Sequence, residues 1–325
     1  MPAYFPLTPG QRGEPVRHLQ RRLGAAGFGP GAGHETGSYG ALTEEGVKAF
    51  QEARGLRADG ICDEITWAAL VEANWRLGDR LLFLTSPNLR GDDVSELQTR
   101  LGRLGFDCGR VDGILGPRTA SALVEFQRNC GLTPDGVCGP STIRSIEVVS
   151  SQSGDGPGVG VVREREMLRE AQGSLANCRI VVGQFGGLSS LARTLSRELR
   201  QVGATVITLD EPDPVAQARA ANQFSADAYV GFEGCSEHTA IAHFYRVPTF
   251  ESIGGRALAE AITDEVRGIP GWLPEVVGMR LPILRETKMP AVLVTLGSAR
   301  MVTDHAPDIA GGVLRAFRQW ISRVA

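Results

Sequence analysis

The sequence predicts a multidomain chain in which two small three-helix domains precede an α/β domain with a largely parallel sheet. Three observations lead to this prediction. One apolar pattern occurs twice within residues 1–149, a stretch rich in Gly and Ser follows at 150–161, and from residue 178 short apolar runs alternate with helical patterns. We therefore divide the chain into a first domain at 1–76, a second at 77–149, a linker with a charged helix at 150–177, and an α/β domain at 178–325.

The repeated pattern has the same order and spacing in both copies. The first copy carries Val16, Leu19, Leu23, Phe50, Gln51, Asp59, Gly60 and Thr66, and the second carries Val94, Leu97, Leu101, Phe126, Gln127, Asp135, Gly136 and Thr142. The V-x-x-L-x-x-x-L spacing places three apolar side chains on one face of a helix, and A-x-x-F-Q repeats this on a second helix. An Asp-Gly turn then leads into a third helix. Each copy is therefore expected to form a three-helix bundle.

The pattern resembles the peptidoglycan-binding domain type 1 family over residues 10–73 and 88–147. The second copy keeps the turn and helix start typical of that family at 111–119, VDGILGPRT, whereas the first has a glycine-rich segment at 29–37 in its place. The resemblance implies that a peptide or glycan groove, if one is kept, lies in the second copy, with Asp112, Arg118 and Gln127 as candidate ligand-binding residues. The alternative is that both copies are scaffolding, because a fold does not carry its ligand with it.

The third domain follows an alternating order of strands and helices. Strands are predicted at 179–182, 204–209, 226–232, 241–247 and 290–296, and helices at 188–203, 214–225, 252–266 and about 307–324. The strand segments are continuously apolar, as expected for parallel strands covered on both faces.

Three segments of this domain decide its chemistry. Residues 183–187 after the first strand read GQFGG, residues 231–235 after the third strand read GFEGC, and residues 281–297 read LPILRETKMPAVLVTLG. The order of elements and the last segment resemble the zinc-dependent N-acetylmuramoyl-L-alanine amidases of the amidase type 3 family. For active members, the resemblance implies zinc bound by a His after the first strand, a Glu at the start of the next helix and a His after the third strand. A catalytic Glu ends the last segment.

None of these four groups is kept in this sequence. Gln184 or Phe185 stands at the first His position, the loop that would carry the zinc-binding Glu is missing after Gly187, Glu233 replaces the second His, and Thr295 replaces the catalytic Glu. General-base activation of a zinc-bound water needs a group whose pKa can be tuned towards neutrality, and a threonine hydroxyl offers none. The sequence therefore predicts a catalytically inactive pseudoenzyme with no cofactor and no metal.

A relocated zinc site is the alternative, and it would make the protein a zinc-dependent N-acetylmuramoyl-L-alanine amidase. Glu233, Cys235, Glu237, His238 and His243 lie close together in the sequence and offer suitable donor atoms. Their spacing matches no metal-binding motif, and such residues in a solvated loop commonly serve solubility alone.

Composition limits the partners. The chain has 34 Lys and Arg against 37 Asp and Glu, a net charge of −3, which is not the basic footprint of a nucleic-acid binder. The N-terminus shows no secretory signal pattern, and no segment approaches the ~18 apolar residues of a membrane span. We therefore expect a cytoplasmic protein without a transmembrane segment. The six cysteines form no CxxC pair, and free, mostly buried thiols are expected.

The whole arrangement is similar to the actinobacterial CwlM-like regulators of peptidoglycan synthesis. This resemblance implies a cytoplasmic partner, UDP-N-acetylglucosamine enolpyruvyl transferase, which the regulator binds and activates under the control of a Ser/Thr kinase and phospho-reading proteins. In the family the phosphorylated threonines lie in a tail beyond the amidase-like domain, whereas this chain ends at Ala325. Phosphorylation is therefore expected at another site, such as Ser150, Ser151 or Ser153, or is not needed. A muropeptide or peptidoglycan precursor binding module is the remaining alternative.

Overall fold

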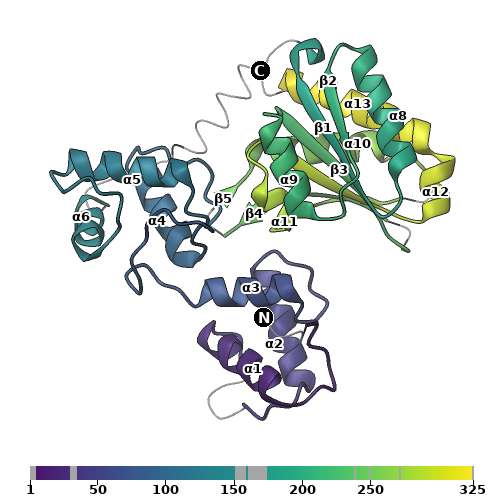
Figure 1. The fold of residues 1–325 in the computed structure, drawn as a ribbon. Helices are drawn as coiled ribbons and strands as arrows, with labels where there is room; N and C mark the ends of the chain where they lie inside the picture. Colours follow the sequence, from purple (N-terminus) through teal and green to yellow (C-terminus); the bar gives the residue numbers. More distant parts are fainter. Residues whose placement is uncertain are drawn as a thin grey trace. The chain divides into compact units, whose positions relative to one another are not determined.

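The structure is a computed structural model that describes residues 5–29, 35–150, 159, 174–237, 239–248, 250–270 and 272–323. By its contacts the chain splits into two compact units, Met1–Gly160 and Val161–Ala325 (Figure 1). The predicted linker and charged helix at 150–177 lie almost entirely outside the described residues.

The first unit contains the two predicted three-helix domains. The first domain consists of α1 (Glu14–Ala25), α2 (Ala41–Ala53) and α3 (Glu64–Ala73), and the second of α4 (Asp92–Arg103), α5 (Pro117–Asn129) and α6 (Pro140–Ser150). The repeated apolar residues form two separate cores. An edge-to-face ring pair with centroids 5.5 Å apart recurs in both, Phe28 with Phe50 and Phe106 with Phe126. The predicted bundles are thus confirmed, and the repeat extends to the packing of individual rings.

A buried glutamine explains why Gln and Asp-Gly recur together. In the first domain, Gln51 donates to Asp59 Oδ1 at 3.0 Å and accepts from the Gly60 N–H at 2.9 Å. Gln127 makes the matching bonds to Asp135 and Gly136, at 2.8 and 2.9 Å. The two glycines have φ of +74° and +72°, in the left-handed region that favours glycine. Each glutamine therefore fixes a tight turn against its second helix.

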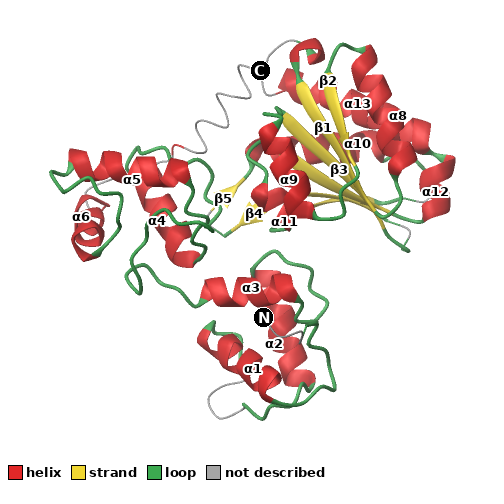
Figure 2. Ribbon diagram, viewed as in Figure 1, coloured by secondary structure: helices red, strands yellow, loops and turns green. Residues whose placement is uncertain are grey.

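The second unit is an α/β domain built on one seven-stranded sheet (Figure 2). Its strands are β1 (Arg179–Phe185), β2 (Thr205–Leu209), β3 (Ala228–Gly234), β4 (Ala240–Val247), β5 (Phe250–Glu251), β6 (Pro274–Met279) and β7 (Ala291–Leu296). The strand order is β2-β1-β3-β7-β4-β5, and β6 pairs with β4. The pairs β1–β2, β1–β3, β3–β7 and β4–β6 are parallel, whereas β4 runs antiparallel to β7 and β5. The prediction of a largely parallel sheet is confirmed.

Helices cover both faces of the sheet (Figure 1). The helices are α8 (Ser189–Gln201), α9 (Pro214–Gln223), α10 (Ile253–Val266), α11 (Pro282–Glu286), α12 (Ala299–Asp304) and α13 (Ala306–Arg323), with a short 3-10 turn, η1 (Leu175–Asn177), before β1. Val182, Val230 and Val292 belong to the core that α8, α10 and α13 complete. On the opposite face, the Tyr229 hydroxyl donates to Gln217 Oε1 of α9 at 2.8 Å. Apolar residues on both faces explain the continuously apolar strands.

Several elements of this unit were not predicted from the sequence. Strand β6, the short strand β5, and helices α11 and α12 lie in segments to which no element was assigned. Pro274 at the start of β6 and the partial exposure of its residues obscure the strand pattern. No helix among the described residues has both the length and the apolar character to span a membrane. All six cysteines are free, four of them buried.

Candidate functional site

The strand register brings three of the positions singled out in the sequence into one row. Phe185 of β1 pairs with Glu233 of β3, and Glu233 pairs with Thr295 of β7. Antiparallel pairing adds β4, because Ile241 lies opposite Thr295 and His243 is two residues further along the same face. The row lies at the carboxyl ends of the parallel strands, where α/β domains place their ligand sites.

Hydrogen bonds connect three of these side chains across three strands. The Thr295 hydroxyl donates to Glu233 Oε2 at 3.2 Å, and its oxygen lies 3.1 Å from His243 Nε2. His243 is 8% exposed, while Glu233 and Thr295 are half-buried. A hydroxyl has one proton, so when it donates to Glu233 the imidazole Nε2–H must donate to the hydroxyl oxygen. The arrangement stabilises a neutral hydroxyl between a carboxylate and an imidazole.

Gln184 lies outside this row. It pairs with Phe232, a residue of the core on the other face of the sheet. Its amide nitrogen donates to Asp210, and its Oε1 accepts from the Leu188 N–H at 2.8 Å. Of the two residues that the sequence offered for the first His position, the structure therefore places Phe185 in the row and gives Gln184 a role at the start of α8.

Of the remaining candidates for a relocated zinc site, the structure describes Cys235 and Glu237. Cys235 Sγ is 3.5 Å from the Glu237 carbonyl oxygen, to which it donates. His238 lies outside the described residues. Within the described part of the chain, no three His, Cys, Asp or Glu side chains come together in a way that could hold a metal ion.

The candidate ligand-binding residues of the second repeat have different surroundings. Gln127 is 1% exposed and uses its amide within the domain. Asp112 Oδ1 accepts from the Gln98 amide at 2.9 Å and from the Ile114 N–H at 2.8 Å. Arg118 is exposed on the first turn of α5. The structure therefore gives Gln127 and Asp112 internal roles in holding turns.

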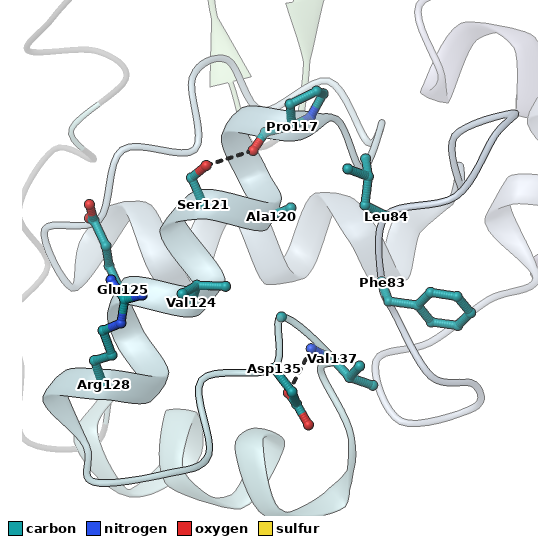
Figure 3. A pocket seen from close by; sticks show the side chains of 11 residues that line it. Phe83, Leu84, Pro117, Ala120, Ser121, Val124, Glu125, Arg128, Asp135 and Val137 are labelled. Atoms are coloured by element: carbon teal, nitrogen blue, oxygen red, sulfur yellow. Dashed lines mark hydrogen bonds between the residues drawn. The ribbon is translucent and has the colours of Figure 1, made fainter.

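A groove that the sequence analysis missed lies beside α5 in the same repeat. Its volume is about 660 Å³, and Ala120 and Val124 of α5, the turn at 135–137, Phe83 and Leu84 line it (Figure 3). The missed signal was the pair of small apolar residues on α5, since the first copy has Glu44 and Lys48 at the corresponding positions.

Comparison with known proteins agrees with this architecture. Residues 12–70 and 90–146 each match the family described as "Putative peptidoglycan binding domain". The chain is 35% identical over 324 residues to the N-acetylmuramoyl-L-alanine amidase CwlM of Mycobacterium tuberculosis, covering 86% of this chain and 79% of that protein. It is 34% identical over 163 residues to the N-acetylmuramoyl-L-alanine amidase CwlL of Bacillus licheniformis, a match that spans 45% of that protein.

Among solved structures, the catalytic domain of the amidase CwlV from Bacillus (Paenibacillus) polymyxa var. colistinus matches 44% of this chain and 98% of its own. The identity is 17% and the TM-score 0.36. The two matches to the putative peptidoglycan binding domain and the match to CwlM define an amidase homologue with two such domains. Because the match to the mycobacterial protein spans most of both chains, this chain belongs to the CwlM family.

Proposed function

We propose that this protein is a catalytically inactive amidase homologue that acts as a cytoplasmic regulator of peptidoglycan precursor synthesis. In this proposal it binds and activates UDP-N-acetylglucosamine enolpyruvyl transferase. The observation that supports it best is the position of the Thr295 hydroxyl, hydrogen-bonded between Glu233 and His243 at the carboxyl edge of the sheet.

The chemistry of this row argues against hydrolysis. Cleavage of a muramoyl-alanine amide by a zinc amidase requires a metal-bound water and a base that accepts its proton. At the position of that base the chain has Thr295, whose hydroxyl does not ionise in the neutral range. Phe185, in the same row, offers hydrocarbon where an imidazole would bind zinc. Glu233 and His243 are both hydrogen-bonded to this hydroxyl.

The regulatory role is inferred from the resemblance to CwlM-like proteins. It requires a surface that binds the transferase and does not require a catalytic group. A regulator that stabilises the active conformation of its target typically contributes about 1–3 kcal/mol of coupling free energy, roughly 5- to 150-fold in an equilibrium. The vestigial row takes no part in such coupling, so a change within it is expected to leave activation intact. Kinase control, with phospho-reading proteins, belongs to the same proposal.

The competing function is that of the amidases after which the relatives are named. It predicts stoichiometric zinc in the pure protein and release of peptide from muramoyl-peptide substrates. Metal analysis and a hydrolysis assay on the full chain distinguish the two. One equivalent of zinc in the pure protein, with turnover that is lost in Glu233→Ala, would refute the proposal that the protein is catalytically inactive.

The regulatory half is tested by a steady-state assay of the transferase from the same organism. The rate is measured with and without this protein, first unphosphorylated and then treated with the native Ser/Thr kinase. Activation should persist in Thr295→Val, which removes the hydroxyl but keeps the shape of the side chain. An unchanged rate in both states, together with no complex in sedimentation, would contradict the proposal.

A further inference from the structure

The second repeat exposes large apolar side chains beside its groove. Phe83 is 42% exposed and Leu84 is 47% exposed, and both line the groove together with Ala120 and Val124 of α5. Figure 3 shows the Phe83 ring projecting away from Ala120 and Val124. Neighbouring apolar side chains at this exposure typically belong to a surface that binds another molecule.

The first repeat folds without these apolar side chains. The β-bridge that Leu7 makes in the first copy is made by Leu82 in the second. The next two residues are Thr8 and Pro9 in the first copy, whereas they are Phe83 and Leu84 in the second. The bundle therefore does not require a large apolar residue at either place.

The second helix of the bundle differs in the same way. The positions of Ala120 and Val124 are occupied in the first copy by Glu44 and Lys48, whose Oε1 and Nζ atoms lie 2.6 Å apart. A Cβ atom placed on Gly60 would lie 2.8 Å from both Glu44 Cγ and Lys48 Cε, so this ion pair covers the turn. The apolar groove thus belongs to the second copy, and a bundle of the same fold forms without it.

The patch around the groove combines a projection with a recess. Phe83 and Leu84 are large and exposed, whereas Ala120 and Gly136 are small residues of the groove lining. In a two-fold interface the same patch of two molecules meets face to face, so each molecule must supply both the projecting and the receiving side chains. A second copy of this chain fits that description.

The charges of the patch are also self-complementary. Glu125 and Arg128 line the groove and are exposed on α5, and neither forms an ion pair within the described part of the chain. The third charged residue of the lining, Asp135, accepts from the Val137 N–H at 2.9 Å and from the Gln127 amide at 2.8 Å. In a two-fold arrangement, Glu125 of each molecule can pair with Arg128 of the other.

We infer that the second repeat forms a two-fold homodimer in solution, with Phe83 of each chain in the groove of the other and Glu125 of each chain paired with Arg128 of the other. The inference goes beyond the proposed regulation of the transferase and uses residues of the second repeat alone. Eleven residues line the groove, about half of the 20–30 that each side of a stable interface typically has. We therefore expect a weak dimer, with a Kd of about 10–300 µM.

Sedimentation velocity on the full chain tests the inference. The sedimentation coefficient should rise with protein concentration between about 5 and 500 µM, as the dimer fraction increases. Phe83→Thr introduces the residue of the first copy and should weaken dimerisation about 10-fold or more, because the interface contains two of these rings. The matched control is Ile65→Thr in the first repeat, where the side chain is 43% exposed, and its Kd should equal that of the unmodified chain.

Charge reversal tests the two-fold pairing. Glu125→Arg and Arg128→Glu should each weaken dimerisation about 3- to 10-fold, because like charges then face each other. An equimolar mixture of the two variants should associate with about the Kd of the unmodified chain, since one variant supplies two arginines and the other two glutamates. Mixing would not restore a contact within one chain. Thermal unfolding of each variant verifies that the repeat is folded.

A chain that is monomeric at every concentration would overturn the inference, and so would an unchanged Kd in Phe83→Thr. Failure of the mixed variants to associate would overturn the two-fold pairing. If the chain stays monomeric and Phe83→Thr abolishes activation of the transferase, the patch binds the transferase instead of a second copy. Activation is measured at about 1 µM protein, where a dimer of this Kd is not populated, so either proposal can fail while the other stands.

Discussion

The buried amide of Gln127 is the most direct test of how the repeats are held together. We expect Gln127→Met to lower the stability of the second repeat without leaving a cavity, because methionine has a similar length and volume. The amide donates to Asp135 Oδ1, the Val137 carbonyl and Thr142 Oγ1 at 2.8, 3.0 and 3.3 Å, and it accepts from the Gly136 N–H at 2.9 Å. All of these bonds are lost in the variant.

The size of the effect follows from the bonds. Two amide protons serve three acceptors, so the amide makes about three full hydrogen bonds, each contributing about 0.5–1.5 kcal/mol net. The Gly136 N–H would also be left without this acceptor in a buried position. We therefore expect a loss of about 2–4 kcal/mol, a large fraction of the ~5–15 kcal/mol that typically stabilises a domain.

Hydrogen exchange on the full chain is the suitable assay. The four tryptophans lie at 67, 75, 272 and 320, outside residues 77–149, so hydrogen exchange reports on the second repeat more directly than fluorescence does. Amide protection should fall throughout α4–α6, and protection in the α/β unit should not change. Arg128→Met, an exposed neighbour on α5, should change stability by less than about 0.5 kcal/mol. A loss below that value in Gln127→Met, or an equal loss in the control, would refute the reasoning.

Three further outcomes are expected. Burial raises the pKa of the Cys62 thiol from 9.0 to about 12. The thiol of the unfolded chain therefore loses its proton at a lower pH than the thiol of the folded chain. Its contribution to the free energy of unfolding is fully present below about pH 8 and declines as the pH rises from 9 towards 12. Urea titrations at pH 8 and 10 should show the decline, and Cys62→Ala should reduce it. Thr295→Val should cost about 1–2 kcal/mol, since it removes two hydrogen bonds of a half-buried hydroxyl; an unchanged denaturation midpoint would show that they contribute nothing. Gly183→Ala should cost about 1–3 kcal/mol or more, because its Cβ would lie 2.2 Å from Tyr229 Oη, whereas Gly268→Ala, with no atom within 4 Å, should be near neutral in the same measurement.

Much of the fold could be predicted because its signals are local. The 3.6-residue apolar spacing in the repeats and the short apolar runs of the third domain each depend on neighbours a few residues away. The same holds for the prediction that Thr295 and Glu233 replace amidase residues, since the segments around them identify these positions. Strand β6 escaped prediction because Pro274 and partly exposed residues weaken its pattern, while pairing with β4 stabilises it in the fold.

The sequence by itself determined the repeat, the order of most strands and helices, and which residues stand at the positions compared with the amidases. Only the tertiary structure decided which contacts the side chains at these positions make. Antiparallel pairing of β4 with β7 brings His243 to Thr295, 52 residues away in the chain. The fold also brings the Gln127 amide against the Gly136 N–H, and it leaves a groove beside α5 at the place that Lys48 occupies in the first copy. Such relations depend on register and on side chains from distant segments, which a local pattern does not contain.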